Sequence, residues 1–366
     1  MVTVNAKQWV LKTETAPGTP FNFDFKSSDS TFELVSKTIN SDELIEGDIL
    51  LETLYVSNDP AQKFWIITAD KNYAAGTQVG ELIPARGIGK VIASKNSALK
   101  VGQLVSANIR WTTHNVISAK EANELKVLSR ENVGELWWYL SILGGTALTA
   151  YFIFYKYAEL RERKEDFGKV FLISGAAGAV GSVSVQLAVN VFKASKVIAI
   201  AGGPKKVRYV ESFGDQVVGV DYKDPDFESK LLKACGGENT VDYFIDNVGG
   251  EILDFSVKLL KPMSMILACG SISGYNDPSK FVFKSYMGVL TKRLIIKGLL
   301  LTDNASEYPQ AFQKLAALIK EGKLNVSNSA TIKDATGENF KDVPLIWNGL
   351  FSGINKGKLI TKINDE

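Results

Sequence analysis

The feature that most constrains the fold of this chain is a glycine-rich turn between an apolar strand and the start of a helix, at residues 169–182. The run Val170–Ser174 leads into Gly175, Gly178 and Gly181. Glycines permit a tight turn and a close approach of backbone to a pyrophosphate, while N–H groups at a helix start favour its negative charge. This order of elements predicts a dinucleotide-binding fold, with Ala176 replacing the first glycine of the usual G-x-G-x-x-G pattern.

Beyond this turn, short apolar runs alternate with amphipathic segments. Such alternation predicts β-α-β units and a doubly wound parallel sheet, the α/β class. The predicted strands are Val170–Ser174, Val197–Ala201, Val217–Val220, Val241–Asp246 and Met265–Cys269, and the predicted helices are Val180–Phe192, Pro204–Phe213, Phe227–Ala234 and Glu251–Leu260.

Residues 1–140 have a different pattern, with short strands at regular spacing and glycine at the turns. This pattern is typical of a partly open β-barrel. After Leu301, one helix (about Pro309–Lys320) and a few short strands are too little for a third domain, so we expect them to pack back on the first. The predicted domains are therefore a first domain at residues 1–140, a dinucleotide-binding domain at residues 141–303, and a C-terminal segment at residues 304–366 that returns to the first domain.

The residues after the second predicted strand indicate which dinucleotide binds. An NAD site usually has an acidic residue about 20 positions after the glycine-rich turn, but none occurs from Phe167 through Val210. The strand instead ends in Gly202-Gly203, followed by Lys205, Lys206 and Arg208. A small loop followed by cations suits the 2′-phosphate of NADP(H), so we expect NADPH. The alternative is that these cations form only a solvated helix face.

The composition limits which partners and which cellular compartment are expected for this protein. The net charge is +2 without long runs of like charge, so nucleic acid is not expected as a partner. Met1–Val10 resembles no signal peptide, and two cysteines do not form a disulfide framework, so we expect a cytoplasmic protein. Leu136–Tyr155 carries no charge and is long enough to span a bilayer. Because Gly144-Gly145-Thr146 interrupts it, we favour buried helix ends around a turn and no membrane span.

The metal-ligand inventory excludes the zinc sites of alcohol dehydrogenases. The chain has one histidine, His114, and two separated cysteines, too few for a catalytic or a structural zinc. Without a metal to polarise a carbonyl, alcohol oxidation is disfavoured. Hydride addition to an electron-poor C=C bond remains feasible, since it needs alignment and a donor for the developing enolate oxygen. The expected substrate is a small electrophile.

Several motifs make the chain similar to the zinc-independent medium-chain dehydrogenase/reductases, in particular the leukotriene hydroxydehydrogenase, prostaglandin reductase and alkenal double-bond reductase group. The resemblance implies a Rossmann domain beside a GroES-like catalytic domain. The motifs are Leu54–Pro60, Ser174–Ser182, Phe244–Gly250, Cys269–Asn276 and Asn355–Lys358.

The resemblance also implies roles for the matched positions. Tyr275 is the catalytic candidate, at the substrate oxygen, while Lys206 and Tyr222 match the 2′-phosphate ligands and Asn247 the residue near the nicotinamide ribose. Each has a structural alternative: Tyr275 as an exposed loop tyrosine, Tyr222 as a packing residue. The other cofactor-binding candidates are Gly175, Ala176, Gly178, Ala179, Val180, Gly181, Gly202, Cys269, Gly270, Ser271 and Asn355.

One departure from the family pattern leaves the activity open. After Asp59-Pro60 the family continues Tyr-Met-Arg, but this chain has Ala61-Gln62-Lys63, with Phe64 and Trp65 as candidate replacements for the lost aromatic. We therefore weigh an alkenal reductase against a quinone reductase and against an NADPH-binding sensor with little turnover. A homodimer is expected, with the apolar segment 293–301 as either a pairing edge strand or a buried central strand.

Overall fold

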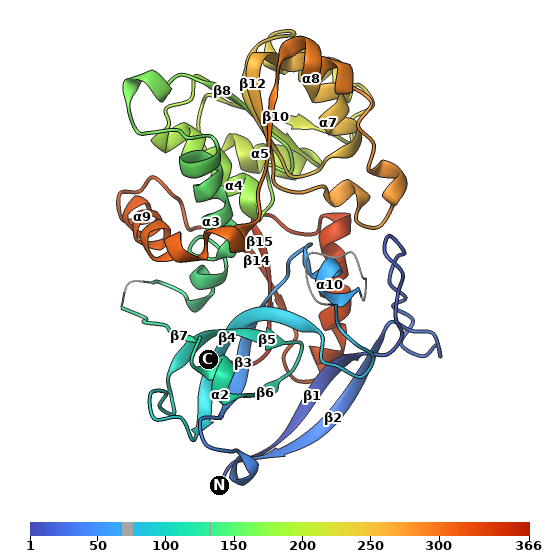
Figure 1. The fold of residues 1–366 in the computed structure, drawn as a ribbon, viewed down its shortest axis with the longest axis vertical. Coiled ribbons are helices and arrows are strands. Elements are labelled where there is room, and N and C mark those ends of the chain that lie inside the picture. Colours follow the sequence, from blue (N-terminus) through green and yellow to red (C-terminus); the bar gives the residue numbers. More distant parts are fainter. Residues whose placement is uncertain (68–75, 132) are drawn as a thin grey trace. The chain divides into compact units, whose positions relative to one another are not determined.

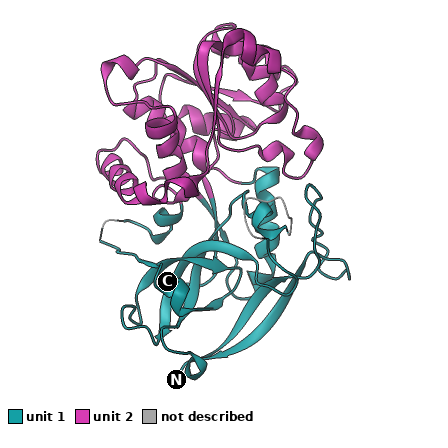
Figure 2. Cartoon of the chain, viewed as in Figure 1, with its two compact units in different colours: residues 1–140, 331–354, 359–366 teal, residues 141–330, 355–358 magenta. Residues whose placement is uncertain are grey.

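The structure, a computed structural model, describes residues 1–67, 76–131 and 133–366. They form two compact units (Figures 1 and 2). The first comprises residues 1–140, 331–354 and 359–366, and the second residues 141–330 and 355–358.

The second unit is built on a six-stranded parallel sheet in the order β10-β9-β8-β11-β12-β13. This is the 3-2-1-4-5-6 order of dinucleotide-binding folds, whose strand order reverses between β8 and β11. The predicted Rossmann sheet is therefore confirmed. Its strands are β8 (Val170–Ile173), β9 (Lys196–Ala201), β10 (Val217–Asp221), β11 (Val241–Asp246), β12 (Leu260–Ala268) and β13 (Ile295–Gly298).

Helices connect these strands and bury apolar side chains against them. Leu231 of the helix after β10 and Ile198, Phe244 and Ile266 of three strands share one core and are almost fully buried. The helices are α3 (Gly145–Phe152), α4 (Ala179–Gln186), α5 (Pro204–Glu211), α6 (Phe227–Cys235), α7 (Gly250–Ser256), α8 (Tyr286–Lys292) and α9 (Tyr308–Lys320), and a π-helical turn, Leu187–Val191, extends α4.

The uncharged run 136–155 is divided among short helices. A 3₁₀ turn, Leu136–Leu140, is followed by α3 and a π-helical turn, Ile153–Tyr157. Phe154 is fully buried and stacks on Phe192, with ring centroids 5.1 Å apart. Among the described residues, no helix has the length and apolarity needed to cross a membrane.

The first unit contains a seven-stranded sheet and a separate two-stranded ribbon. The sheet order is β14-β15-β3-β4-β5-β7, with β6 pairing β3, and β1 pairs β2 antiparallel in the ribbon. The bounds are β1 (Thr3–Leu11), β2 (Phe32–Asn40), β3 (Ile49–Ser57), β4 (Pro84–Ser94), β5 (Leu104–Arg110), β6 (His114–Ile117), β7 (Lys126–Val127), β14 (Ala330–Asp334) and β15 (Lys358–Lys362), with helices α1 (Gln62–Ile66), α2 (Ala119–Ala122) and α10 (Val343–Ser352).

Aromatic side chains fill the core of the first unit. Trp9, Phe32, Trp111 and Trp347 are almost fully buried and come from segments far apart in the sequence. The Trp9 indole N–H donates to the carbonyl of Phe340, 3.1 Å away, so one buried polar group is satisfied. Non-local contacts of this kind explain why the C-terminal segment returns to this unit.

Several predicted bounds differ from the observed ones. The helix predicted at Glu251–Leu260 ends at Ser256, and a 3₁₀ turn leads into β12, which begins at Leu260. Of segment 293–301, only Ile295–Gly298 is a strand. Residues 304–330 group with the second unit, not with the return segment, because α9 packs against α3.

Candidate functional site

The glycine-rich turn joins β8 to α4. Gly178 is the N-cap residue of α4, and Gly175 has a φ of 59°, which favours glycine. A Cβ on Gly181 would lie 2.3 Å from the Gly175 carbonyl oxygen, so only glycine fits. The first N–H groups of α4, from Ala179, Val180 and Gly181, have no partner within the helix and can donate hydrogen bonds to an anion. The turn thus fits a pyrophosphate.

The ends of β9 and β10 bring Gly202 and Tyr222 together. A Cβ on Gly202 would lie 2.6 Å from Cε1 of Tyr222, so the tyrosine ring packs on the bare glycine backbone. The Gly203 N–H donates to Oδ1 of Asp221 at 2.8 Å, which holds the small loop against the end of β10. Tyr222 remains half exposed, so its hydroxyl can reach a ligand.

Lys206 lies in the first turn of α5 and is partly buried, whereas Lys205 and Arg208 are exposed. Burial, followed by the charge of Lys223, lowers the pKa of the Lys206 ammonium. No carboxylate of the described residues pairs with Lys206. Lys223 is the neighbouring cation, and its ammonium lies 6.0 Å from the centroid of the Tyr222 ring. Two cations close together suit a dianionic phosphate.

The end of β11 carries a buried hydrogen-bond network. One carboxylate oxygen of Asp246, which is 2% exposed, accepts from the Ser174 hydroxyl at 2.8 Å and from the N–H groups of Val248 and Gly249, both at 3.0 Å. Asn247 donates its backbone N–H to the Ser174 hydroxyl at 2.9 Å and its side-chain amide to the Ser174 carbonyl at 2.7 Å. The network therefore locks the ends of β8 and β11 together.

Asp246 is a residue that the sequence analysis missed. Burial raises the pKa of its carboxyl group, against the opposing effect of the hydrogen bonds from Gly249, Val248 and Ser174. The signal in the sequence was an acidic residue at the end of an otherwise apolar strand, directly before a candidate ligand residue. Such a buried acid requires partners, and here they are the Ser174 hydroxyl and two backbone N–H groups of the site.

The end of β12 brings the remaining candidates together around Gly270. The N–H groups of Cys269 and Gly270 donate to the Asp246 carbonyl at 2.8 and 3.1 Å. A Cβ on Gly270 would lie 3.3 Å from the Asn247 carbonyl oxygen and 3.4 Å from the Tyr275 hydroxyl. The Ser271 N–H lies 3.4 Å from that hydroxyl and donates to it. Tyr275 thus lies beside Asn247, not in a remote loop.

Cys269 contributes its backbone rather than its thiol. Burial, followed by the Asp246 charge, raises the pKa of the thiol to about 12, so it stays protonated at neutral pH. The thiolate is the nucleophilic form of cysteine. Cys269 therefore has no electrostatic feature of a nucleophile.

Asn355 and its neighbours lie against the glycine-rich turn. Asn355 is buried, and its side-chain amide donates to the Gly357 carbonyl at 2.6 Å. The Gly357 N–H donates to the Ala177 carbonyl at 2.8 Å. Residues 355–358 belong to the second unit, so this C-terminal segment completes the site from within it.

In the first unit, the residues that depart from the family pattern have structural partners. Gln62 accepts from the Asp59 N–H at 2.8 Å and donates to the Pro84 carbonyl at 3.0 Å. Lys63 is fully buried, donates to the Thr19 carbonyl at 2.6 Å and lies 3.8 Å from the centroid of the Phe21 ring. These side chains therefore stabilise the segment around α1. Trp65, one of the candidate replacements for the lost aromatic, lies 5.7 Å from the Arg86 guanidinium.

Comparisons with known proteins show to which family the chain belongs. Residues 7–125 match the family model described as the N-terminal domain of oxidoreductase, and residues 179–319 match the one described as zinc-binding dehydrogenase. The chain is 31% identical to prostaglandin reductase 1 of Bos taurus, over 98% of this chain and 99% of that protein. The chain belongs to the zinc-independent medium-chain dehydrogenase/reductases. It is therefore an oxidoreductase.

Other members of the family extend the comparison. The chain is 64% identical to a Saccharomyces cerevisiae protein called uncharacterized membrane protein YML131W, covering 99% of this chain and 100% of that one. The crystal structure of CurA from Vibrio vulnificus in complex with NADPH is 25% identical with a TM-score of 0.82, covering 98% of this chain and all of that one. One matched model has zinc in its description, yet no group of three or more possible ligands among the described side chains could hold a metal ion.

Proposed function

We propose that this oxidoreductase uses NADPH to reduce the C=C bond of α,β-unsaturated aldehydes or ketones. The observation that carries the proposal is the Tyr275 hydroxyl beside Asn247 and Gly270, at the carboxyl ends of β11 and β12. Ligands of open α/β sheets bind at this edge. Two relatives have names in keeping with this chemistry: prostaglandin reductase 1 and the NADPH-dependent curcumin reductase of Escherichia coli, the latter 25% identical over 87% of this chain.

The side chains at the second unit's sheet edge fit NADP(H). Tyr222 packs on Gly202 on the β9–β10 side, Lys206 follows in the first turn of α5, and Lys223 is near enough to lower the pKa of Lys206, so the 2′-phosphate would be held here. The glycine-rich turn in the middle would hold the pyrophosphate, which leaves the β11–β12 side for the nicotinamide half. When bound, NADPH supplies the hydride.

Tyr275 stabilises the charge that develops on the substrate. Its hydroxyl donates a hydrogen bond to the carbonyl oxygen, which becomes an enolate oxygen as hydride reaches the β-carbon. The Ser271 N–H donates to the same hydroxyl and thereby fixes its orientation. The α-carbon then takes a proton from solvent or from Tyr275, so that one hydride and one proton are added across the C=C bond.

Steady-state oxidation of NADPH with a panel of 2-alkenals, enones and quinones tests the activity. We expect turnover of alkenals or enones with NADPH and little with NADH. Tyr275→Phe should reduce kcat by about a hundredfold, the usual effect of losing one oxyanion donor, while NADPH still binds. Turnover restricted to quinones, or NADPH binding without any turnover, would reject the proposal in favour of a quinone reductase or a sensor.

The same assay tests the cofactor assignment. Lys206→Ala should reduce the preference for NADPH over NADH by about tenfold or more, because a charged hydrogen bond to the 2′-phosphate is lost. Lys205→Ala is the matched control, since Lys205 is exposed on the same helix and should leave the preference unchanged. An unchanged preference in the Lys206 variant would reject this assignment.

We also propose a cytoplasmic homodimer. Strand β13 is an edge of the parallel sheet, with Ile295 and Ile296 40% and 45% exposed. An exposed apolar edge with unpaired backbone groups favours pairing with a second copy. Because one relative is called a membrane protein, cell fractionation is the direct check of location: we expect the protein in the cytosolic fraction, and its recovery in membranes after a high-salt wash would contradict this.

A further inference from the structure

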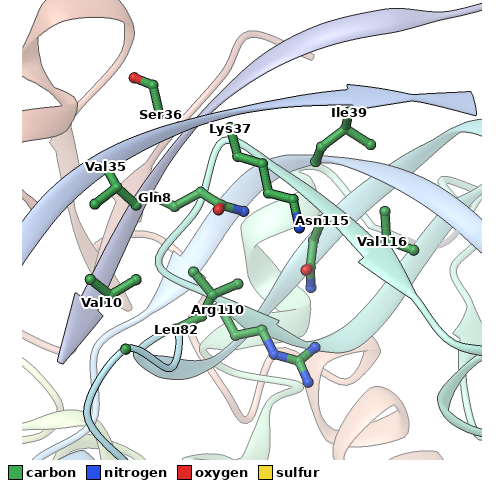
Figure 3. Close-up of a pocket in the computed structure, with 11 residues that line it drawn as sticks. Gln8, Val10, Val35, Ser36, Lys37, Ile39, Leu82, Arg110, Asn115 and Val116 are labelled. Carbon is green, nitrogen blue, oxygen red and sulfur yellow. The ribbon is translucent and has the colours of Figure 1, made fainter.

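The first unit contains a cavity that the proposed reaction does not use. Its volume is about 540 Å³, within the range of sites for small organic molecules. It lies between the β1–β2 ribbon and the β5–β6 region of the sheet (Figure 3). Gln8 and Val10 of β1 and Val35, Lys37 and Ile39 of β2 supply the ribbon side.

Hydrogen-bond donors gather in the middle of this cavity. Lys37, Asn115 and Arg110 line it, and Figure 3 shows the Asn115 amide between the ends of the other two side chains in that view. No aspartate or glutamate is among the described residues that line it. The described lining is therefore rich in donors, and Lys37 carries its positive charge, since Arg110 is paired with Glu121.

Two of these donors are buried without a partner. Asn115 is 4% exposed, and its amide nitrogen makes no hydrogen bond. Arg110 donates through Nη2 to Glu121 at 2.7 Å, but its buried Nη1 has no acceptor. A buried donor left unsatisfied lowers stability, so native structures nearly always provide an acceptor. The acceptor missing from the protein is expected from a ligand.

The rest of the lining is apolar. Val10, Val35 and Leu82 lie on one side of the donors in Figure 3, and Ile39 and Val116 lie on the other. A phosphate ion would leave these side chains without contact, whereas a carboxylate with a short hydrocarbon part would cover them. We infer that this cavity binds a small organic carboxylate, with its oxygens on Lys37, Asn115 and Arg110.

Calorimetric titration of the NADPH-loaded protein with acetate, butyrate, hexanoate and inorganic phosphate tests the inference. Saturating NADPH occupies the anion site at Lys206, so that binding there does not interfere. We expect one carboxylate per chain, with butyrate or hexanoate binding more tightly than acetate or phosphate. Failure of every carboxylate to saturate would overturn the inference, and phosphate binding more tightly than all of them would overturn the carboxylate assignment.

Two variants locate the binding. Asn115→Leu removes the unpartnered amide at similar volume, and Lys37→Met removes the exposed ammonium; each should weaken carboxylate binding by about tenfold. Asn115→Leu should also leave the unliganded Tm unchanged or higher, because it removes an unsatisfied buried donor. Lys7→Met, on the same ribbon but paired with Glu338, is the matched control and should bind normally. Equal affinity in all four proteins would place the carboxylate elsewhere and overturn the inference.

Discussion

At the residue scale, most of the candidate site depends on backbone groups that a few side chains hold in place. Asp246 and Ser174 show this most directly, since together they fix the backbone on both sides of Asn247. Neither side chain needs to contact a ligand to affect ligand binding. Replacing such a positioning residue removes no group that binds the ligand, but it displaces the backbone groups that do.

Ser174→Ala should therefore weaken NADPH binding by about tenfold, because Asn247 loses one of its two hydrogen bonds to residue 174. Ser264→Ala is the control: Ser264 is also buried and donates to a backbone carbonyl, in the middle of β12 and away from the carboxyl end where the site lies. Fluorescence titration with NADPH measures both. Equal weakening in the two variants would mean that only general stability was lost.

Lys63 predicts a pH dependence of stability. Burial lowers the pKa of its ammonium from 10.5 to about 8 in the folded protein. Between these values the unfolded chain binds the proton and the folded chain does not, so the contribution of Lys63 to the free energy of unfolding should rise with pH. Below pH 8 both states are protonated, and this contribution becomes independent of pH.

Urea unfolding between about pH 8 and pH 9.5 measures this contribution as the difference in stability between the wild type and Lys63→Met, which should grow in favour of the wild type as pH rises. The comparison is needed because burial raises the pKa of the Cys235 and Cys269 thiols to about 12, which lowers the stability of both proteins over the same range. The upper limit avoids Tyr55, because burial raises the pKa of its hydroxyl and the unfolded tyrosine would lose its proton first, which lowers stability above pH 10. Lys100→Met, at an exposed position, should have the same pH dependence as the wild type. A difference between the wild type and Lys63→Met that does not change with pH would show that Lys63 stays charged when folded.

At the element scale, the β8–α4 connection requires glycine for packing. Gly181→Ala would place a methyl group 2.3 Å from the Gly175 carbonyl oxygen and 2.6 Å from the Ala176 Cα, both rigid backbone. We expect a loss of about 1–3 kcal/mol of stability and of most NADPH affinity, measured by thermal unfolding and titration. Gly298→Ala, where the added methyl group meets nothing within 4 Å, should leave both unchanged. An unaffected Gly181 variant would show that the turn is more open than described.

At the scale of the whole molecule, the exposed edge of β13 decides the expected assembly. Ile296→Lys places a charge on an apolar edge that we propose pairs with a second copy, so the dimer should become a monomer. Light scattering after size-exclusion chromatography measures the mass. Ile332→Lys, at an equally exposed isoleucine of the first unit, is the control and should remain dimeric. A monomeric wild-type protein would reject the dimer.

The sequence by itself determined the parallel sheet and its central turn. Four of the five predicted strands of that sheet match the observed ones to within a residue, because buried parallel strands are short apolar runs and local glycines mark the turns. The absence of an acidic residue near the end of β9 was likewise readable along the chain. These features are local, so no knowledge of distant contacts was needed.

Only the tertiary structure decided the contacts between segments far apart in the chain. The buried cation Lys63 meets a carbonyl 44 positions away, Asp246 meets a hydroxyl 72 positions away, and Gly357 meets the turn at Ala177. The sequence could name Asn247 and Tyr275 as candidates, but not show that they meet at Gly270. The physical reason is that a buried polar group takes whichever partner the fold places beside it, and its own neighbours in sequence do not specify that partner.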